Sequence, residues 1–258
     1  MIIGSGINIV GGFRYKPRAG TIGSAFFNGT DQYLTMTMPN APGTDNFTIE
    51  WWSFIPSWPT DMNFIETRVG TGADSFGMAV NLVSPSSLRL RVCGTLSSTT
   101  LAIPANTWRH MAVVGVVTGS TRVTTLYVNG TETLTTSQST TGRELSRNLL
   151  TIGRAFDYAS TPSYYSGYMS NFRYVKGIAV YTSDFLPMMN TLMRTQDFYS
   201  GPFYNIEAIT GTQTQILLQT PYSADNLKNF SSYSVPITNN NGVTASTLTP
   251  AFPPAVEY

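Results

Sequence analysis

The chain has 258 residues, which is enough for one large all-β or α/β domain, or for two small ones, with a sizeable core. Charged residues make up only 11% of the chain, and its net charge of +1 gives no field that would draw it to nucleic acid or to an anionic membrane. The single cysteine, Cys93, excludes an intrachain disulfide, and its "RLRVCGTL" surroundings favour a buried, unreactive thiol.

The first twenty residues predict an extended N-terminal arm. They hold five glycines and three basic residues without one acid, and such a segment buries little apolar surface. Two interpretations stay open: a solvated terminus, or an anchor that lies across a neighbouring subunit. The anchoring residues would be Phe13, Arg14, Tyr15, Lys16 and Arg18.

We expect no targeting or membrane-spanning segment. Residues 1–20 lack the basic start and long apolar stretch of a secretory signal, and no run of 18 or more apolar residues occurs in the chain. The sequence therefore predicts a protein that is made in the cytoplasm and does not span a membrane.

Two Asn-Gly pairs predict β-hairpins. The first is Asn28-Gly29 in "SAFFNGTDQYLTMTM", between two apolar runs, and the second is Asn129-Gly130 in "LYVNGTET". Such a pair suits the two-residue turn between adjacent antiparallel strands, because both residues tolerate a positive φ.

Alternating runs predict strands along most of the chain. In "FTIEWWSFIP", Phe47, Ile49 and Trp51 share one side, which indicates a strand with one buried face. Similar runs follow at spacings of roughly 8 to 15 residues, the rhythm of a sandwich or barrel. Helical signals are weak, and the best of them lies in "FLPMMNTLMRTQDF" at 185–198.

The last strands predict how the sheet edges are closed. The run "TQILLQ" follows many finished hairpins, and an open sheet edge needs cover. We therefore expect Ile216 to Leu218 to pair near Phe26 and Phe27. No internal repeat or linker divides the chain, so we expect an arm at 1–20 and one domain at 21–258.

Residues 170–185, "SNFRYVKGIAVYTSDF", predict a strand with one wall in the core. The alternation breaks near Ser170 and Asn171, which indicates a β-bulge. The pair Lys176-Gly177 allows a tight change of direction, because glycine tolerates backbone conformations that other residues avoid. We expect residues 180–185 to fold back over one open end of the sandwich.

The motifs, taken in order, resemble those of a known family. They are "FFNGTDQYL", "FTIEWW", "NTWRHMAVV", "TLYVNGT", "LLTIGR", "GYMSNFRYVKGIAVYTSDFLP", "TQILLQ" and "NGVTASTLTP". Over about residues 24–252 this series resembles the laminin G-like branch of the concanavalin A-like jelly rolls. It is most similar to the single domains found in virion proteins of tailed bacteriophages, especially those of marine and cyanobacterial hosts.

The resemblance implies a two-sheet antiparallel jelly-roll sandwich that serves binding or structural decoration more often than catalysis. The residues that match the family motifs are Trp51, Trp108, His110, Tyr127, Val128, Asn129, Gly130, Asn171, Phe172, Arg173, Gly177, Tyr181 and Phe185. Two residues depart from the pattern: Met169 replaces a longer aliphatic residue, and Arg109 lies where a His or Tyr is frequent. The N-terminal arm lies outside the resemblance.

Catalysis has little support in the residues. A retaining glycosidase needs two carboxylates about 5 to 5.5 Å apart, and Glu50, Glu66 and Glu132 have no acidic neighbour at strand spacing. The single histidine, His110, lies on an apolar stripe, so we expect a structural imidazole bound by a carbonyl or carboxylate. For Arg173 we likewise expect a loop carbonyl or carboxylate as partner. The protein is therefore expected not to be an enzyme.

Metal binding also has little support, and we expect no cofactor. One His and one Cys cannot form a zinc site without carboxylates. Calcium stays open as an alternative, because oxygen ligands leave little trace in a sequence. The acids on predicted loops are Asp31, Asp45, Asp61, Asp74 and Asp157.

The tyrosine-rich segment "FDYASTPSYYSGY", at 156–168, is the predicted contact site. A carbohydrate site needs an aromatic platform with polar groups nearby, and protein interfaces are also rich in tyrosine, so both interpretations stay open. Exposure of Trp52 and Trp58 would suit either one. The candidate binding residues are Asp157, Tyr158, Tyr164, Tyr165 and Tyr168.

Two functional expectations follow. The first is a non-enzymatic structural protein in the virion of a tailed bacteriophage, a capsid decoration or fibre-type protein that contacts other virion proteins and forms a homo-oligomer. The alternative is a lectin-like, glycan-binding module of a tail fibre or host-recognition protein, whose partner would be a host surface glycan.

Overall fold

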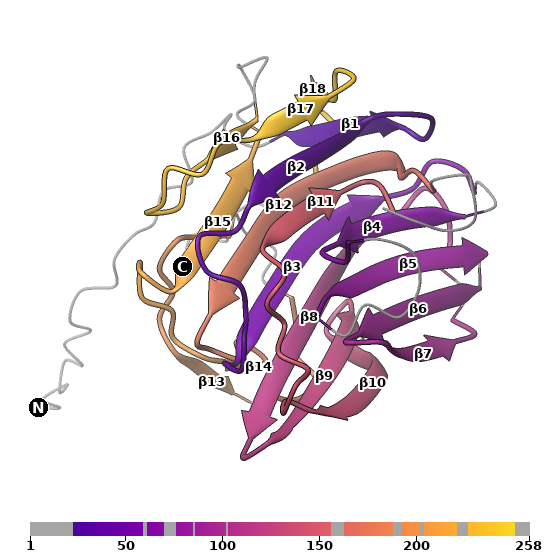
Figure 1. The fold of residues 1–258 in the computed structure, drawn as a ribbon. Helices are drawn as coiled ribbons and strands as arrows, with labels where there is room; N and C mark the ends of the chain where they lie inside the picture. Colours follow the sequence, from indigo (N-terminus) through magenta and orange to yellow (C-terminus); the bar gives the residue numbers. More distant parts are fainter. Residues whose placement is uncertain are drawn as a thin grey trace, which may run out of the picture.

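The computed structural model of the protein describes residues 23–58, 61–69, 76–84, 86–101, 103–155, 163–187, 192–201, 204–220 and 227–250. Within these ranges the chain forms strands and no helix, and two antiparallel sheets face each other as a sandwich (Figure 1). The predicted all-β jelly-roll sandwich is therefore confirmed, and the described part of 185–198 is not helical. No helix long and apolar enough to cross a membrane occurs in the described ranges.

The larger sheet has nine strands. They are β1 (Ser24–Asn28), β3 (Phe47–Phe54), β8 (Trp108–Thr118), β9 (Thr121–Val128), β10 (Thr131–Ser139), β12 (Ser166–Lys176), β15 (Thr214–Gln219), β16 (Lys228–Asn229) and β18 (Thr244–Ser246). The order is β10-β9-β8-β3-β12-β1-β18, with β15 beside β12 and β16 beside β15. β1 pairs with residues 166–169 of β12 and β15 pairs with residues 172–175, so the two strands share one side of β12.

The second sheet has seven strands and packs against the first. They are β2 (Tyr33–Thr37), β4 (Met62–Glu66), β5 (Met78–Ser84), β6 (Ser87–Val92), β7 (Thr95–Thr99), β11 (Leu149–Ile152) and β17 (Thr238–Asn240). The order is β17-β2-β11-β4-β5-β6-β7. A separate small hairpin consists of β13 (Tyr199–Gly201) and β14 (Tyr204–Ile206).

The inner faces of both sheets form the main core. Trp51 of β3 is fully buried there, with its ring centroid 6.0 Å from that of Phe64 and 6.3 Å from that of Phe172. These contacts join β3, β4 and β12, so the tryptophan fixes the two sheets against each other. Trp58 is partly buried and packs against the same core.

The outer face of the nine-stranded sheet, turned away from the seven-stranded one, carries a second apolar cluster. Its members are Ala112, Val114, Tyr127 and Val175 from the sheet, and Ala179, Val180, Tyr181, Phe185, Ile206 and Ile209 from a later segment. We call the described residues 178–187, 192–201 and 204–209 the strap. Because the strap covers this face, β3 is buried on both sides, and the prediction of one buried face is wrong. Trp52 is buried as well, so it offers no exposed ring for a contact site.

The segment 170–185 forms the predicted bulge and turn. The pairing of β12 with β3 shifts between Ser170 and Arg173, and Asn171 has a φ of 52°, which confirms the bulge. Gly177 has a φ of 86° directly after β12, where the chain turns back. Residues 180–185 then lie on the outer face, so the expectation that they close an open end is wrong. The apolar side chains on that face explain the difference.

The two Asn-Gly pairs have different outcomes. Asn129 and Gly130 have φ values of 51° and 77°, and β9 pairs with β10 across them, so this hairpin is confirmed. The hairpin predicted at Asn28-Gly29 is wrong, because β1 and β2 belong to different sheets. The Asn28 side-chain oxygen accepts hydrogen bonds from the backbone N–H groups of Thr30 and Asp31, which shapes a loop that crosses the sandwich.

A late strand does return beside the first one, but it is not the predicted strand. β18 pairs with β1, with Thr244 opposite Phe26. Ile216 to Leu218 of β15 pair instead with residues 172–174 of β12, so their predicted pairing near Phe26 and Phe27 is wrong. The register of β12 explains this, because β1 occupies only the first part of that strand.

Two further predictions concern single residues and the chain start. Cys93 is fully buried, and its thiol donates a hydrogen bond to the carbonyl oxygen of Arg143 at 3.1 Å, as expected of an unreactive thiol. Residues 1–22 lie outside the described ranges. The anchoring arm, with Phe13, Arg14, Tyr15, Lys16 and Arg18, therefore stays a prediction.

Candidate functional site

The outer face of the nine-stranded sheet has two ends with different surroundings. At the covered end, which includes Glu50, His110 and Arg173, the strap lies over the sheet and these side chains are buried. At the open end, which consists of Phe26, Phe54, Trp108 and Tyr168, the side chains are only half-buried. Either end could hold a site.

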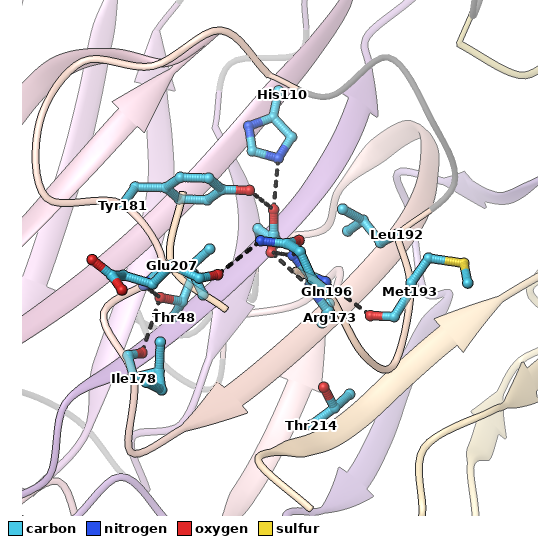
Figure 2. A network of polar contacts seen from close by, with 12 residues as sticks. Thr48, His110, Arg173, Ile178, Tyr181, Leu192, Met193, Gln196, Glu207 and Thr214 are labelled. Atoms are coloured by element: carbon cyan, nitrogen blue, oxygen red, sulfur yellow. Dashed lines mark hydrogen bonds and ion pairs between the residues drawn. The ribbon is translucent and has the colours of Figure 1, made fainter. Parts of the chain in front are cut away.

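The covered end contains a polar network around the carboxylate of Glu50 (Figure 2). One oxygen, Oε1, accepts hydrogen bonds from Nε of Arg173 at 2.8 Å and from its Nη2 at 2.5 Å. The other, Oε2, accepts a hydrogen bond from the hydroxyl of Tyr181 at 2.7 Å and lies 3.0 Å from Nε2 of His110. The predicted roles of His110 and Arg173 as partners of a carboxylate are confirmed.

Arg173 also ties the network to the strap. Its Nη1 donates to the backbone carbonyl of Met193 at 2.8 Å, and its Nη2 donates to the side chain of Gln196 at 3.0 Å. Gln196 in turn donates to the carbonyl oxygen of Glu207 at 3.1 Å. The guanidinium therefore connects β3 and β12 directly with residues 192–201 of the strap, and through Gln196 with residues 204–209. Its charge is matched by Glu50.

The electrostatics of the network favour a fixed ion pair. Burial alone would raise the pKa of Glu50, but the charge of Arg173 and the hydrogen bonds from His110 and Tyr181 lower it to about 2. Burial and the adjacent Glu50 charge raise the pKa of the Tyr181 phenol well above its ordinary value. A carboxylate that stays ionised and fully bound is a poor general acid or base. The covered end is thus a structural network that holds the strap.

The other buried carboxylate is held in a similar way. Glu66 accepts hydrogen bonds from Nε and Nη2 of Arg68, both at 2.6 Å, and both side chains are buried. Burial raises the pKa of Glu66 although Arg68 opposes that shift. Each of these two acids faces an arginine instead of a second carboxylate, so neither has the paired geometry of a glycosidase.

The open end carries a row of four aromatic rings on four neighbouring strands. Phe26 of β1 lies opposite Tyr168 of β12, Tyr168 opposite Phe54 of β3, and Phe54 opposite Trp108 of β8. The successive ring centroids are 5.0 Å, 5.9 Å and 5.5 Å apart. We call these four residues the aromatic row. At the usual strand spacing it extends about 14 Å across the sheet.

The predicted tyrosine site is not one surface. Tyr168 belongs to the aromatic row. The ring centroid of Tyr164 lies instead 6.3 Å from that of Tyr33 in β2. The guanidinium of Arg154 lies over both of these rings. Tyr165 is fully buried, and its hydroxyl donates to the carbonyl oxygens of Phe54 and Tyr168. Its predicted role as a surface contact is therefore wrong, because its ring fills the core. Asp157 and Tyr158 lie outside the described residues.

The described part of the chain shows no cluster of metal-binding side chains. No group of three or more His, Cys, Asp or Glu side chains lies close enough together there to hold an ion. Asp45 pairs with Lys176 at 3.3 Å, and Asp31 accepts a hydrogen bond from Asn28. Asp74 and Asp157 lie outside the described residues.

A pocket of about 570 Å³ opens beside the first residues of β8. Its described lining residues are Thr99, Thr100, Leu101, Pro104, Arg109, Val128, Asn129, Thr131, Glu132 and Thr133. They come from the end of β7, the connection to β8, the second residue of β8, and the hairpin between β9 and β10. A volume of this size falls within the range of small-molecule sites. Most of these residues are polar and carry hydroxyl, amide or charged groups, and the others are apolar.

The sequence indicated these residues only weakly. Phe26, Phe54 and Trp108 lie at strand ends and point outward, but only the strand order and register bring them beside Tyr168. The sequence marked Arg109 only as a departure from the family pattern and did not indicate that it lines a pocket. The signal that could have found the row is the outward position of an aromatic residue at the same end of four strands.

Comparison with known proteins supports the fold. The model of the concanavalin A-like lectin/glucanases superfamily matches residues 28–178. No curated protein matches the sequence. A solved protein from Bacteroides ovatus ATCC 8483, proposed to bind carbohydrate, is 16% identical with a TM-score of 0.56 over 88% of this chain and 60% of its own. The present chain thus spans only about 60% of that protein.

Two further solved structures have similar folds. The heptameric SAP-like pentraxin of Limulus polyphemus is 15% identical, with a TM-score of 0.50 over 86% of this chain and 95% of its own. Tailspike protein 2 of bacteriophage CBA120 is 13% identical, with a TM-score of 0.42 over 64% of this chain and 30% of its own. At these identities the likeness concerns the fold alone. The family model, in contrast, covers more than half of the chain, and the chain therefore belongs to the concanavalin A-like lectin/glucanases superfamily.

Proposed function

We propose that the protein is a non-catalytic carbohydrate-binding domain that takes its glycan on the aromatic row at the open end. The observation that carries this proposal is the row itself: four half-buried rings in contact on four adjacent strands. The apolar C–H faces of sugar rings pack against aromatic side chains, and rings held on strands are already in position. The row is also long enough for more than one sugar ring.

The state of the buried carboxylates supports a domain without catalytic activity. Glu50 and Glu66 each form an ion pair with an arginine. Glycoside hydrolysis requires two carboxylates that face each other across the bond, and neither acid is arranged in this way. Binding without turnover also suits the covered end, where the fixed network keeps the sheet rigid beneath the strap.

A glycan array tests the proposal. We expect the wild-type protein to bind a defined set of oligosaccharides, and Tyr168→Ala to lose at least ten-fold in affinity for them. The matched control is Phe230→Ala, which removes another exposed ring outside the row and should bind as the wild type does. Absence of binding to any glycan, or equal binding by Tyr168→Ala, would overturn the proposal and favour a protein contact at the row.

We place this domain, as a second proposal, on the particle of a tailed bacteriophage, as a capsid decoration or fibre-type protein. The order of motifs along the chain supports this, and so do the exposed apolar side chains of the strap, which suit contact with neighbouring subunits. These are Leu186, Met193, Phe198 and Tyr199. We expect a homo-oligomer, because sites on a virion repeat by symmetry.

The virion proposal has its own test. Mass spectrometry of purified particles should find the protein, and a variant without residues 1–20 should fold yet fail to join the particle. Detection of the protein only outside the particles would overturn the virion assignment. Full occupancy by the truncated variant would overturn the anchoring role of the arm.

A further inference from the structure

Arg109 is a buried arginine with no partner among the residues that the structure describes. Its side chain is only 5% exposed and lines the pocket of about 570 Å³. Among the described residues it makes no ion pair and no side-chain hydrogen bond. Burial lowers the pKa of the guanidinium. A buried charge that is left unpaired is costly, and arginine is seldom buried in this way unless something binds it.

Arg173 shows what a satisfied buried arginine looks like in this protein. It is fully buried, and its guanidinium donates to Glu50, Met193 and Gln196. The donors of Arg109 have no such acceptors among the described residues, and the residue lines the pocket. The difference points to an acceptor that arrives from solution.

The rest of the pocket limits what that acceptor can be. The one acid among its described lining residues is Glu132, an exposed side chain that already accepts a hydrogen bond from Thr135 at 2.8 Å. A dianion such as a phosphate would be repelled by this carboxylate, whereas a single negative charge would balance Arg109. The surrounding threonines and Asn129 offer hydroxyl and amide groups, which suit a ligand with several hydroxyls.

We propose that this pocket binds the carboxylate of an acidic sugar, with Arg109 as the recognition residue. Both carboxylate oxygens would accept hydrogen bonds from the planar guanidinium, the geometry in which arginine binds carboxylates best. The sugar hydroxyls would contact the threonines and the rim at Glu132, and Leu101 and Pro104 offer apolar contact to the ring. This inference rests on the proposed carbohydrate-binding function and adds the ligand class.

The test is a titration with two sugars that differ at one carbon. The full-length protein is titrated with D-glucuronate and with D-glucose, and binding is followed by calorimetry and by NMR. We expect D-glucuronate to bind at least ten-fold more tightly than D-glucose, because only it carries the carboxylate. Glucose 6-phosphate, a dianion near neutral pH, should bind more weakly than D-glucuronate.

Three variants assign the effect to the pocket. Arg109→Met should lower the affinity for D-glucuronate at least ten-fold, and Arg109→Lys should give an intermediate loss, because it keeps the charge but not the planar fork. Arg143→Met, which removes an exposed positive charge elsewhere, should bind as the wild type does. Arg109→Met should melt no lower than the wild type, since no partner is left unpaired; if it does not fold, Arg109→Lys decides.

The outcomes separate this inference from the proposed function. Equal binding of D-glucuronate by the wild type and Arg109→Met, or equal binding of both sugars by the wild type, overturns the role of the pocket. Neutral oligosaccharides that bind on the array while D-glucuronate does not would overturn the acidic-sugar inference alone. A protein that binds no sugar of any kind would overturn both.

Discussion

The two ends of the outer sheet face differ in how their charges and rings are used. At the covered end, each nitrogen of the Arg173 guanidinium donates to an acceptor, and the Glu50 carboxylate is bound on both oxygens. At the open end, four rings stay half-buried. Arg109 follows Trp108 in β8 but lies on the opposite face of the sheet, and it has no partner among the described residues. Neighbouring positions of one strand thus serve opposite purposes.

This contrast shows why a buried constellation of Glu, His, Tyr and Arg need not be an active site. The network at Glu50 contains the residue types of an acid–base site, but its groups are occupied by one another and lie under the strap. The open end has only aromatic side chains, and these are half-buried, so part of each ring can contact a ligand. A candidate binding site therefore differs from a structural network in whether its side chains are free to contact a ligand, and not in which residue types it contains. Four predictions test this contrast, from the largest expected effect to the smallest.

Glu50→Gln should destabilise the protein most. It keeps the size of the side chain but removes the charge, which leaves the buried Arg173 cation uncompensated, and breaking such a pair costs about 3 to 5 kcal/mol. Chemical denaturation would measure the loss. Asp197→Asn, which changes an exposed acid of the strap, is the control and should change the free energy of unfolding little. A loss below about 1 kcal/mol for Glu50→Gln would contradict a structural role for the network.

Acid should weaken the covered end in a defined range. The pKa of Glu50 is lowered from 4.5 to about 2 in the folded protein, so its stabilising effect is complete above pH 4.5 and is lost as the pH falls toward 2. A shift of this size corresponds to about 3 kcal/mol. Urea denaturation between pH 6 and pH 2 measures it, and Glu50→Gln should lack this part of the pH dependence. An identical pH profile for the variant would show that other groups cause the acid sensitivity.

Tyr168→Ala should affect binding more than folding. The ring is half-buried and contacts Phe26 and Phe54, and an aromatic pair contributes about 0.5 to 1.5 kcal/mol beyond the area that it buries. We expect a loss of roughly 1 to 2 kcal/mol in the free energy of unfolding, together with the ten-fold loss of glycan affinity. Thermal melts beside array data give both values. A stability loss as large as that of Glu50→Gln would place Tyr168 in the scaffold.

Arg109→Met should have the smallest effect on stability, and its sign should be opposite to that of Arg173→Met. The first replaces a desolvated cation without a partner and should leave the free energy of unfolding within about 1 kcal/mol of the wild type, or raise it. The second leaves Glu50 without its ion-pair partner and should cost about 3 to 5 kcal/mol. Equal losses for the two variants would remove the distinction between the two arginines.

The strand pattern could be predicted from the sequence because it depends on local residues. The alternation in "FTIEWWSF", the broken parity near Ser170, and the Asn129-Gly130 turn all reflect neighbours in the chain. The turn at Asn28-Gly29 shows the limit of this reasoning. The same dipeptide there joins strands of two different sheets, and only the packing of the whole sandwich decides that.

The candidate site was less accessible to prediction. Tyr164, Tyr165 and Tyr168 are close in sequence, but they lie beside β2, in the core, and on the outer face respectively, because the chain enters β12 between the first two and the third. The roles of His110 and Arg173 could be predicted because each lies on an apolar strand face and needs a partner. The rows that cross the sheet depend on register, which the sequence alone does not define.

The indole N–H signals of the four tryptophans offer the most direct test of whether the open end binds sugar. They report from the core (Trp51), from the covered end of the outer face (Trp52), from the edge of the core (Trp58) and from the aromatic row (Trp108). In a titration of the ¹⁵N-labelled protein with an oligosaccharide that binds on the array, the account predicts that the Trp108 signal moves most and that Trp51 stays in place. A saturating titration that leaves Trp108 unmoved would contradict it.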